Sequence, residues 1–231
     1  MPILVPIDVS APARTAVDVA TTLARARHED VVLVHAHPGP EPAGLELLAA
    51  LHELAEPVRD RGVRVRIRVV TGDPVGRLCR WARENRASFI VTGTRGPTDP
   101  ATSTARGLSL CSSIPVVAVR PSIPNQDAGY GPIHVVSPAH TTAADIAGGL
   151  AAQWNRPSVS TPWSGAMGTL PPEVLEDETA LTIVSVEGAD AWPEWCESLV
   201  RDALGSVLIV SRGTGRHQQS VEPATWWAVA R

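Results

Sequence analysis

Short apolar runs that alternate with helix-forming segments constrain the fold of this chain more than any other feature. Each run holds six or seven residues with few polar side chains, as expected of a strand buried on both faces of a sheet. The runs are PILVPI (2–7), VVLVHAH (31–37), SFIVTG (88–93) and IPVVAVR (114–120). Strands alternating with helices at this spacing predict βα units, and therefore an α/β fold with a mostly parallel sheet over residues 1–120.

The segments between these runs carry the start signals and periodicity of helices. Ser10 followed by Pro12 predicts a helix start after the first strand, and Asp73 followed by Pro74 predicts another. Residues 45–58 have the apolar spacing of an amphipathic helix. The leucines and valine of that apolar face are Leu47, Leu51, Leu54 and Val58.

One further segment, VRVRIRVV (63–70), alternates strictly between apolar and charged residues. Its three arginines, Arg64, Arg66 and Arg68, fall on one face of an extended chain. This alternation predicts a half-exposed strand at an edge of the sheet, where arginine also opposes pairing with other chains.

The pattern restarts more faintly after a segment rich in proline and glycine. We therefore predict a first domain over residues 1–120, a linker over 121–132, a degenerate second copy over 133–213 and a tail over 214–231. IHVVSP (133–138), residues 141–154, ALTIVSVEG (180–188) and SVLIVSRG (206–213) match the first strand, the first helix and the last two strands. A helical face is expected at Trp192, Trp195, Leu199 and Ala203. Nothing in the second copy matches the amphipathic helix or the arginine strand.

Composition and charge argue against a nucleic-acid-binding, membrane-spanning or secreted protein. The net charge is -4, and neither half carries the dense basic stripe of a nucleic-acid binder. No apolar stretch approaches the roughly 20 residues of a membrane span, and the N-terminus lacks the features of a secretory signal. We expect a cytoplasmic protein whose three cysteines, Cys79, Cys111 and Cys196, are reduced structural thiols.

A ligand site is expected where the strands of such a sheet end. Asp8 follows the first strand, and Gly93 and Gly96 follow the fourth strand in a G-x-x-G pattern. The carboxylate can accept hydrogen bonds from a ribose hydroxyl or an adenine amine, and the glycines let backbone N–H groups approach a phosphate. A helix expected from about Ser103 adds a favourable end for an anion. A capping role for Asp8 and a plain tight turn at the glycines stay open as alternatives.

Residues 1–120 resemble the universal stress protein family. The resemblance rests on four segments in order: ILVPIDVSAPARTAVDVATTLA, VVLVHAHP, VVTGDPVGRLCRWARENRASFIVTGTRG and IPVVAVRP. It implies an open parallel five-stranded sheet of order 3-2-1-4-5 with helices on both faces, a Rossmann-like arrangement. The arginine strand would lie at an edge. The two copies would pair much as the family's dimers do.

The resemblance also implies an adenine-nucleotide site. Many family members bind ATP or AMP through G-x2-G-x9-G-[ST] after the fourth strand. The adenine-side aspartate falls on Asp8, the second-strand backbone position on Ala36, and the closing glycine and hydroxyl residue on Thr102 and Ser103, in a loop about four residues short. The cofactor-binding residues predicted on this basis are Pro6, Ile7, Asp8, Ser10, Ala36, Gly93, Arg95, Gly96, Thr102, Ser103 and Thr104.

The loop favours a small ligand over a triphosphate. Pro97 and Pro100 remove two N–H donors, and Asp99 opposes phosphate by roughly 3 kcal/mol per charge pair. We therefore expect AMP to bind more readily than ATP, unless Mg²⁺ bridges Asp99 to ATP. Because Ser137 and Glu187 stand at the matching places of the second copy, we expect no second nucleotide site there.

Two function classes remain. One is a non-catalytic, nucleotide-binding regulator, and the other is a scaffold that kept the fold and lost the ligand. Enzyme activity is not expected, because the first strand lacks G-x-G-x-x-G and a chain without lysine cannot carry a Walker motif. A protein partner or a homodimer is expected through the second domain or the last strands, with Trp226 and Trp227 as possible anchors.

Overall fold

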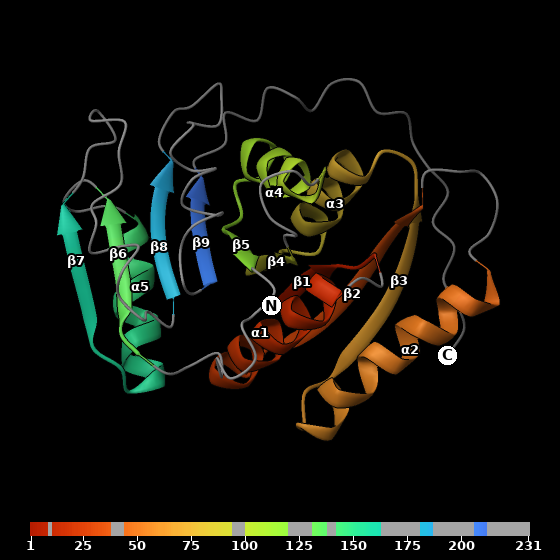
Figure 1. The fold of residues 1–231 in the computed structure, drawn as a ribbon, viewed down its shortest axis with the longest axis horizontal. Coiled ribbons are helices and arrows are strands. Elements are labelled where there is room, and N and C mark those ends of the chain that lie inside the picture. Colours follow the sequence, from red (N-terminus) through yellow and green to blue (C-terminus); the bar gives the residue numbers. More distant parts are fainter. Residues whose placement is uncertain are drawn as a thin grey trace.

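The strands of the chain form one continuous sheet (Figure 1). The computed structural model describes residues 1–8, 11–37, 44–93, 100–119, 131–137, 142–162, 181–186 and 206–211. Within them the sheet has nine strands in the order β3-β2-β1-β4-β5-β9-β8-β6-β7. The first five are β1 (Pro2–Pro6), β2 (Asp30–His37), β3 (Val65–Thr71), β4 (Phe89–Gly93) and β5 (Val116–Val119). They are parallel to one another, so the order 3-2-1-4-5 and the α/β class are confirmed.

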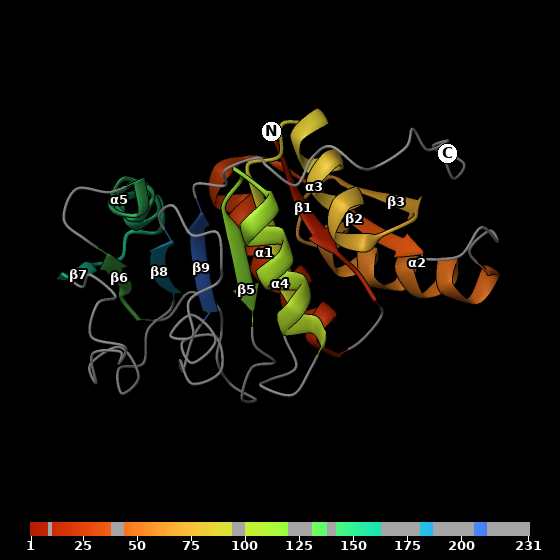
Figure 2. The same cartoon turned by 90° about the horizontal axis from the view of Figure 1, so that it is seen from above.

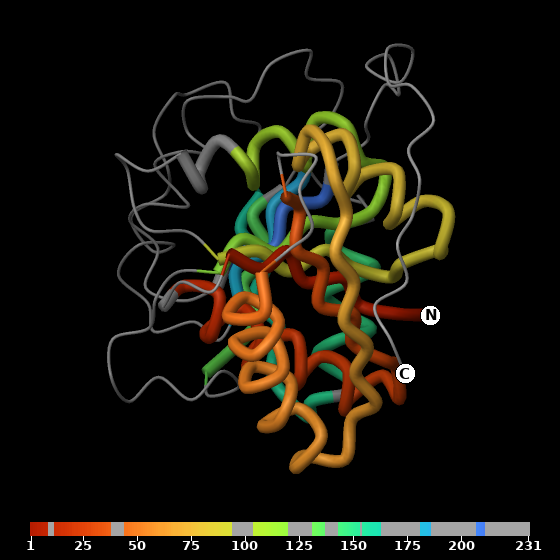
Figure 3. The backbone as a smooth tube through the Cα atoms, turned by 90° about the vertical axis from the view of Figure 1, so that its right-hand side faces the viewer, coloured from red at the N-terminus to blue at the C-terminus, as the bar shows by residue number. Residues whose placement is uncertain are grey.

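Helices cover both faces of this part of the sheet. They are α1 (Ala11–Arg27), α2 (Leu45–Asp60), α3 (Pro74–Glu84) and α4 (Pro100–Cys111). Figure 1 shows α3 and α4 above the strands and α1 and α2 below them. In the end-on view of Figure 3, the orange α2 and the yellow α3 again lie on opposite sides of the strands.

Alternate residues of the buried strands supply two cores, one on each face. Val5 and Leu33 pack in the cluster that includes Leu51 of α2. Leu4 and Val34 pack in the other cluster with Leu78 of α3. Because neighbouring residues of a strand point to opposite faces, continuous apolar runs are needed to fill both layers.

Local signals placed α3 and the edge strand correctly. The Asp73 carboxylate accepts a hydrogen bond from the Gly76 N–H at 2.7 Å, and Pro74 occupies the first turn of α3. β3 lies at one end of the sheet order, with Arg66 half exposed and 3.8 Å from Asp30. Both predictions are therefore confirmed. None of the described helices has the length and apolar character that a membrane span requires.

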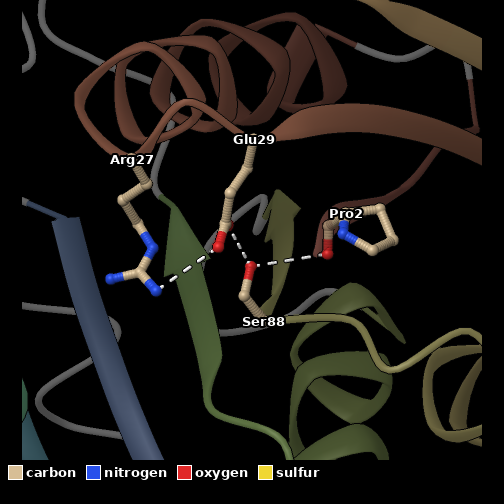
Figure 4. Close-up of polar contacts among 4 residues, drawn as sticks. All are labelled: Pro2, Arg27, Glu29 and Ser88. Atoms are coloured by element: carbon tan, nitrogen blue, oxygen red, sulfur yellow. Dashed lines mark hydrogen bonds and ion pairs between the residues drawn. The ribbon is translucent and has the colours of Figure 1, made fainter.

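A polar cluster ties the amino ends of three neighbouring strands together (Figure 4). The hydroxyl of Ser88, just before β4, donates to the carboxylate of Glu29, just before β2, and lies 3.4 Å from the carbonyl oxygen of Pro2 in β1. Arg27 pairs with Glu29 at 3.4 Å and stands 5.1 Å above the ring of Phe89. These contacts fix the strand starts and so the relative height of their carboxyl ends.

The second half of the chain extends the sheet from β5. Its elements are β6 (Ile133–Ser137), α5 (Thr142–Trp154), β7 (Ser158–Pro162), β8 (Leu181–Val186) and β9 (Ser206–Ser211). β9 joins β5 antiparallel, with Leu208 opposite Val117, while β7, β6, β8 and β9 are mutually parallel. Figure 2 shows α5 and α2 at opposite ends of the molecule. The strand order β7-β6-β8-β9 repeats β2-β1-β4-β5, and none of the described strands of the second half corresponds to β3.

Two features of secondary structure differ from the sequence-based expectations. β7 was not predicted, because its sequence is polar and ends in proline. The fourth helix begins at Pro100 rather than near Ser103, since proline has the backbone angle of a helix start and needs no N–H partner in the first turn. Thr102 and Ser103 therefore lie inside that turn. The helix expected at Trp192 to Ala203, the linker at 121–130 and the tail lie outside the described residues.

The prediction of reduced cysteines is wrong for two of the three. A disulfide joins Cys79 of α3 to Cys111 of α4, whose Cα atoms are 6.4 Å apart. Their separation of 32 positions in sequence concealed this pairing. Successive βα units place α3 and α4 side by side, so residues far apart in sequence meet. Cys196 lies outside the described residues.

Candidate functional site

A pocket opens at the carboxyl ends of β1, β2 and β4. The space within it, counted together with the open solvent at its mouth, is about 680 Å³. The strand order reverses between β1 and β4, and such switch points are where ligands bind to open parallel sheets. The residues that line the pocket are Pro6, Ile7, Asp8, Pro12, Ala13, Val34, His35, Ala36, Pro74, Leu78, Thr92, Gly93 and Thr104.

The carboxyl end of β1 is held by β2 through both backbone polar groups of one residue, Ile7. The Ile7 N–H donates to the Val34 carbonyl at 2.9 Å, which extends the ladder beyond β1. The Ile7 carbonyl oxygen lies 2.7 Å from Nδ1 of His35. A carbonyl can only accept, so Nδ1 carries the proton in this contact. The backbone is thus fixed immediately before Asp8, whose exposed carboxylate lies at the pocket.

The exit of β4 is pressed against the first turn of α1. A Cβ atom placed on Gly93 would lie 2.5 Å from the carbonyl oxygen of Pro12. Gly93 has no left-handed backbone angle, so packing, and not backbone torsion, requires glycine here. Because Gly93 also lines the pocket, its lack of a side chain lets β4 and α1 meet closely at the pocket floor.

The amino end of α4 supplies the third wall. Thr104 of this helix lines the pocket, and the helix starts four residues earlier at Pro100. The N–H groups of the first turn have no partner within the helix, and the helix dipole makes this end favourable for an anion. This end can therefore receive a phosphate.

Six of the predicted site residues line the pocket together. They are Pro6, Ile7, Asp8, Ala36, Gly93 and Thr104. Ser10, Arg95 and Gly96 lie outside the described residues, and of Thr102 and Ser103 only the backbone is described. Whether any of them binds a ligand stays a prediction.

The sequence interpretation missed the contributions of α1 and α3. Pro12 and Ala13 line the pocket from α1, and Pro74 and Leu78 line it from α3. Pro74 was predicted only as a helix start, and Leu78 was given no role in the site. His35 was likewise not predicted as a site residue, and it lines the pocket beside Ala36. The adjacency of His35 to the predicted backbone position was the available signal.

A comparison with models of protein families matches the segment that the sequence predicted as the first domain. The model described as the universal stress protein family matches residues 1–120, just over half of the 231-residue chain. The chain belongs to the universal stress protein family. A comparison with curated proteins found no match.

Solved structures share the fold over most of the chain. A universal stress protein from Archaeoglobus fulgidus DSM 4304 is 14% identical with a TM-score of 0.69, covering 92% of this chain and 98% of that one. A functionally unknown protein from Pseudomonas aeruginosa PAO1 is 13% identical with a TM-score of 0.65, covering 91% and 92%. A universal stress protein from Archaeoglobus fulgidus in complex with dAMP is 26% identical with a TM-score of 0.44, covering 51% and 96%.

Proposed function

We propose that this universal stress protein is a non-catalytic regulator that binds an adenine nucleotide, AMP in preference to ATP, in the pocket at the end of β1 and β4. The observation that carries the proposal is that one pocket has a hydrogen-bond acceptor on one side and the amino end of a helix on the other. Asp8 offers a hydrogen-bond acceptor at the β1 side, and α4 offers a helix amino end near the β4 side. A nucleoside with one phosphate has matching groups, with hydroxyl and amine donors at one end and an anion at the other.

The charges of the lining favour few phosphates. The described lining residues include one carboxylate, Asp8, and no arginine. A triphosphate would bring several negative charges without a described cation to meet them, whereas the amino end of one helix compensates about half a charge. ATP with Mg²⁺ is therefore the weaker ligand in this proposal.

We also propose that the second half is a shortened copy of the first, and that it binds no nucleotide. The repeated strand order β7-β6-β8-β9 supports the copy, and the β5–β9 pairing would then join the two copies within one chain. Ser137 ends β6 where Asp8 follows β1, so a neutral hydroxyl stands there in place of the carboxylate of the first copy. One nucleotide per chain is expected.

Calorimetry with AMP tests these proposals together. We expect AMP to bind with a stoichiometry near one, ATP with Mg²⁺ to bind more weakly, and Asp8→Ala to weaken AMP binding about tenfold, the value of one hydrogen bond to a charged group. The control is Asp18→Ala, which removes an exposed acid of α1 that pairs with Arg61. Absence of heat at millimolar AMP, or binding indifferent to Asp8→Ala, would favour the scaffold function instead. An assay for released phosphate checks the non-catalytic part.

His35 is expected to position the β1 exit without touching the ligand. His35→Ala removes the hydrogen bond to the Ile7 carbonyl and should weaken AMP binding about fivefold, the effect of one neutral hydrogen bond. His35→Asn places an amide N–H close to the original Nδ1 and should keep most of the affinity. Equal losses in both variants would mean that Nε2 contacts the ligand, and the positioning role would be wrong.

A further inference from the structure

The disulfide between Cys79 and Cys111 lies between two helices that both line the nucleotide pocket. α3 contributes Pro74 and Leu78 to the lining, and α4 contributes Thr104. Cys79 is the next residue after Leu78. Both cysteines are half-buried and not fully enclosed by the core.

Helices α3 and α4 pack against each other along one face of each helix. α3 and α4 run in the same direction, because each returns the chain to the start of the next parallel strand. A Cβ atom on Gly107 would lie 2.9 Å from a methyl carbon of Val75, so the helices approach closely there. Cys79 and Cys111 each follow these residues by four positions, and so lie one turn further along the same contact. The disulfide therefore fixes the helices one turn beyond the close approach of Val75 and Gly107.

The surroundings also suit the reduced form. The sulfur of Cys79 lies 3.9 Å from the Leu108 carbonyl oxygen, and the sulfur of Cys111 lies 4.0 Å from the Val75 carbonyl oxygen. Each carbonyl belongs to the opposite helix. A disulfide sulfur has no proton to donate, but each thiol of the reduced pair would find a weak acceptor in place. Both redox states can thus exist within the folded protein.

We propose that Cys79 and Cys111 form a thiol–disulfide exchange site whose oxidation state controls ligand affinity in the neighbouring pocket. The co-reactant is a dithiol. Its thiolate attacks one sulfur to form a mixed disulfide and releases the other cysteine as a thiolate, which takes a proton. The second thiol of the reductant then displaces the first cysteine. Two electrons and two protons pass to the protein, and the dithiol becomes a disulfide.

The coupling follows from the geometry of the two helices. In the oxidised state, α3 and α4 are held at one spacing, so Leu78 and Thr104 keep their separation across the pocket. Reduction leaves the Val75–Gly107 contact and removes the covalent link beside Leu78, so α3 can shift against α4 at that turn. The oxidised protein is the form with higher affinity. This part rests on the proposed nucleotide binding.

Alkylation of the full-length native protein tests the exchange site without any ligand. Treatment with dithiothreitol should add two alkylated cysteines by mass spectrometry, at Cys79 and Cys111, while tryptophan fluorescence remains that of the folded protein. Thiols that appear only after denaturation would overturn the exchange site.

AMP titration of oxidised and reduced protein tests the coupling. Reduction should weaken binding about fivefold or more, the usual lower range of coupling between sites. Cys111→Ser should bind as the reduced protein does and ignore dithiothreitol, whereas Cys196→Ser should respond as the wild type does. Equal affinity in both states would overturn the coupling and leave nucleotide binding standing. Absence of AMP binding in either state would refute the proposed function and the coupling, while the alkylation result decides the exchange site separately.

Discussion

Replacement of Cys79 and Cys111 by alanine in one variant is expected to lower the free energy of unfolding by about 3.5 kcal/mol. The bridge spans 32 positions of sequence, and it restricts the unfolded chain by closing that loop. For a chain of this size the melting temperature should fall by about 10 °C. Urea unfolding followed by tryptophan fluorescence measures the change, since the buried Trp81 lies on α3 with Cys79.

The reduced wild type is the matched comparison for this variant. It should unfold at nearly the same urea concentration as the double variant, because both lack the crosslink. Cys196→Ala should unfold with the oxidised wild type. A double variant within about 1 kcal/mol of the oxidised protein would contradict the structure, because a crosslink of this length stabilises by more than that.

Local patterns were sufficient for the first five strands. The alternation of arginine with apolar residues in β3 describes a strand with one exposed face, and this face exists because β3 has a neighbour on one side within the described sheet. Asp73 capped α3 as predicted because a side chain and an N–H three residues away meet through local backbone geometry. Such signals need no knowledge of the rest of the chain.

Features that depend on which strand or helix becomes a neighbour could not be predicted from the local sequence. β7 has exposed serines and an exposed Val159, so its sequence lacks the apolar signal of a strand. It forms because β6 offers an open edge, and its place at the end of the sheet tolerates Pro162. The disulfide likewise depends on which helices become neighbours, which the spacing of cysteines does not reveal.

In the candidate site, too, some residues were predicted from local sequence signals and others were missed. Asp8 and Gly93 were predicted because both directly follow strands that end at one edge of the sheet. The α3 side of the pocket was missed, because the residues there, Pro74 and Leu78, have the ordinary appearance of a helix start and a core position. The reason that glycine is needed at position 93 was also incomplete, since Pro12 is distant in sequence.

Gly93→Ala is therefore expected to be among the most damaging single substitutions near the pocket. The new Cβ would lie 2.5 Å from the Pro12 carbonyl oxygen and 2.6 Å from its carbonyl carbon. These atoms are backbone of the first turn of α1, so the strand or the helix must shift, at a cost of about 2–3 kcal/mol. The same shift should weaken AMP binding, because Pro12, Ala13 and Gly93 line one pocket.

Gly148→Ala in α5 is the matched control for the same chemical change. A Cβ on Gly148 has open space, so alanine should leave stability unchanged or raise it by up to about 1 kcal/mol through its better helix propensity. Urea unfolding compares both variants with the wild type, and calorimetry with AMP follows the pocket. If Gly93→Ala is as stable as Gly148→Ala, α1 does not press on β4 in solution. If Gly93→Ala loses stability and still binds AMP normally, the close approach matters to packing alone, and the ligand does not contact this part of the pocket floor.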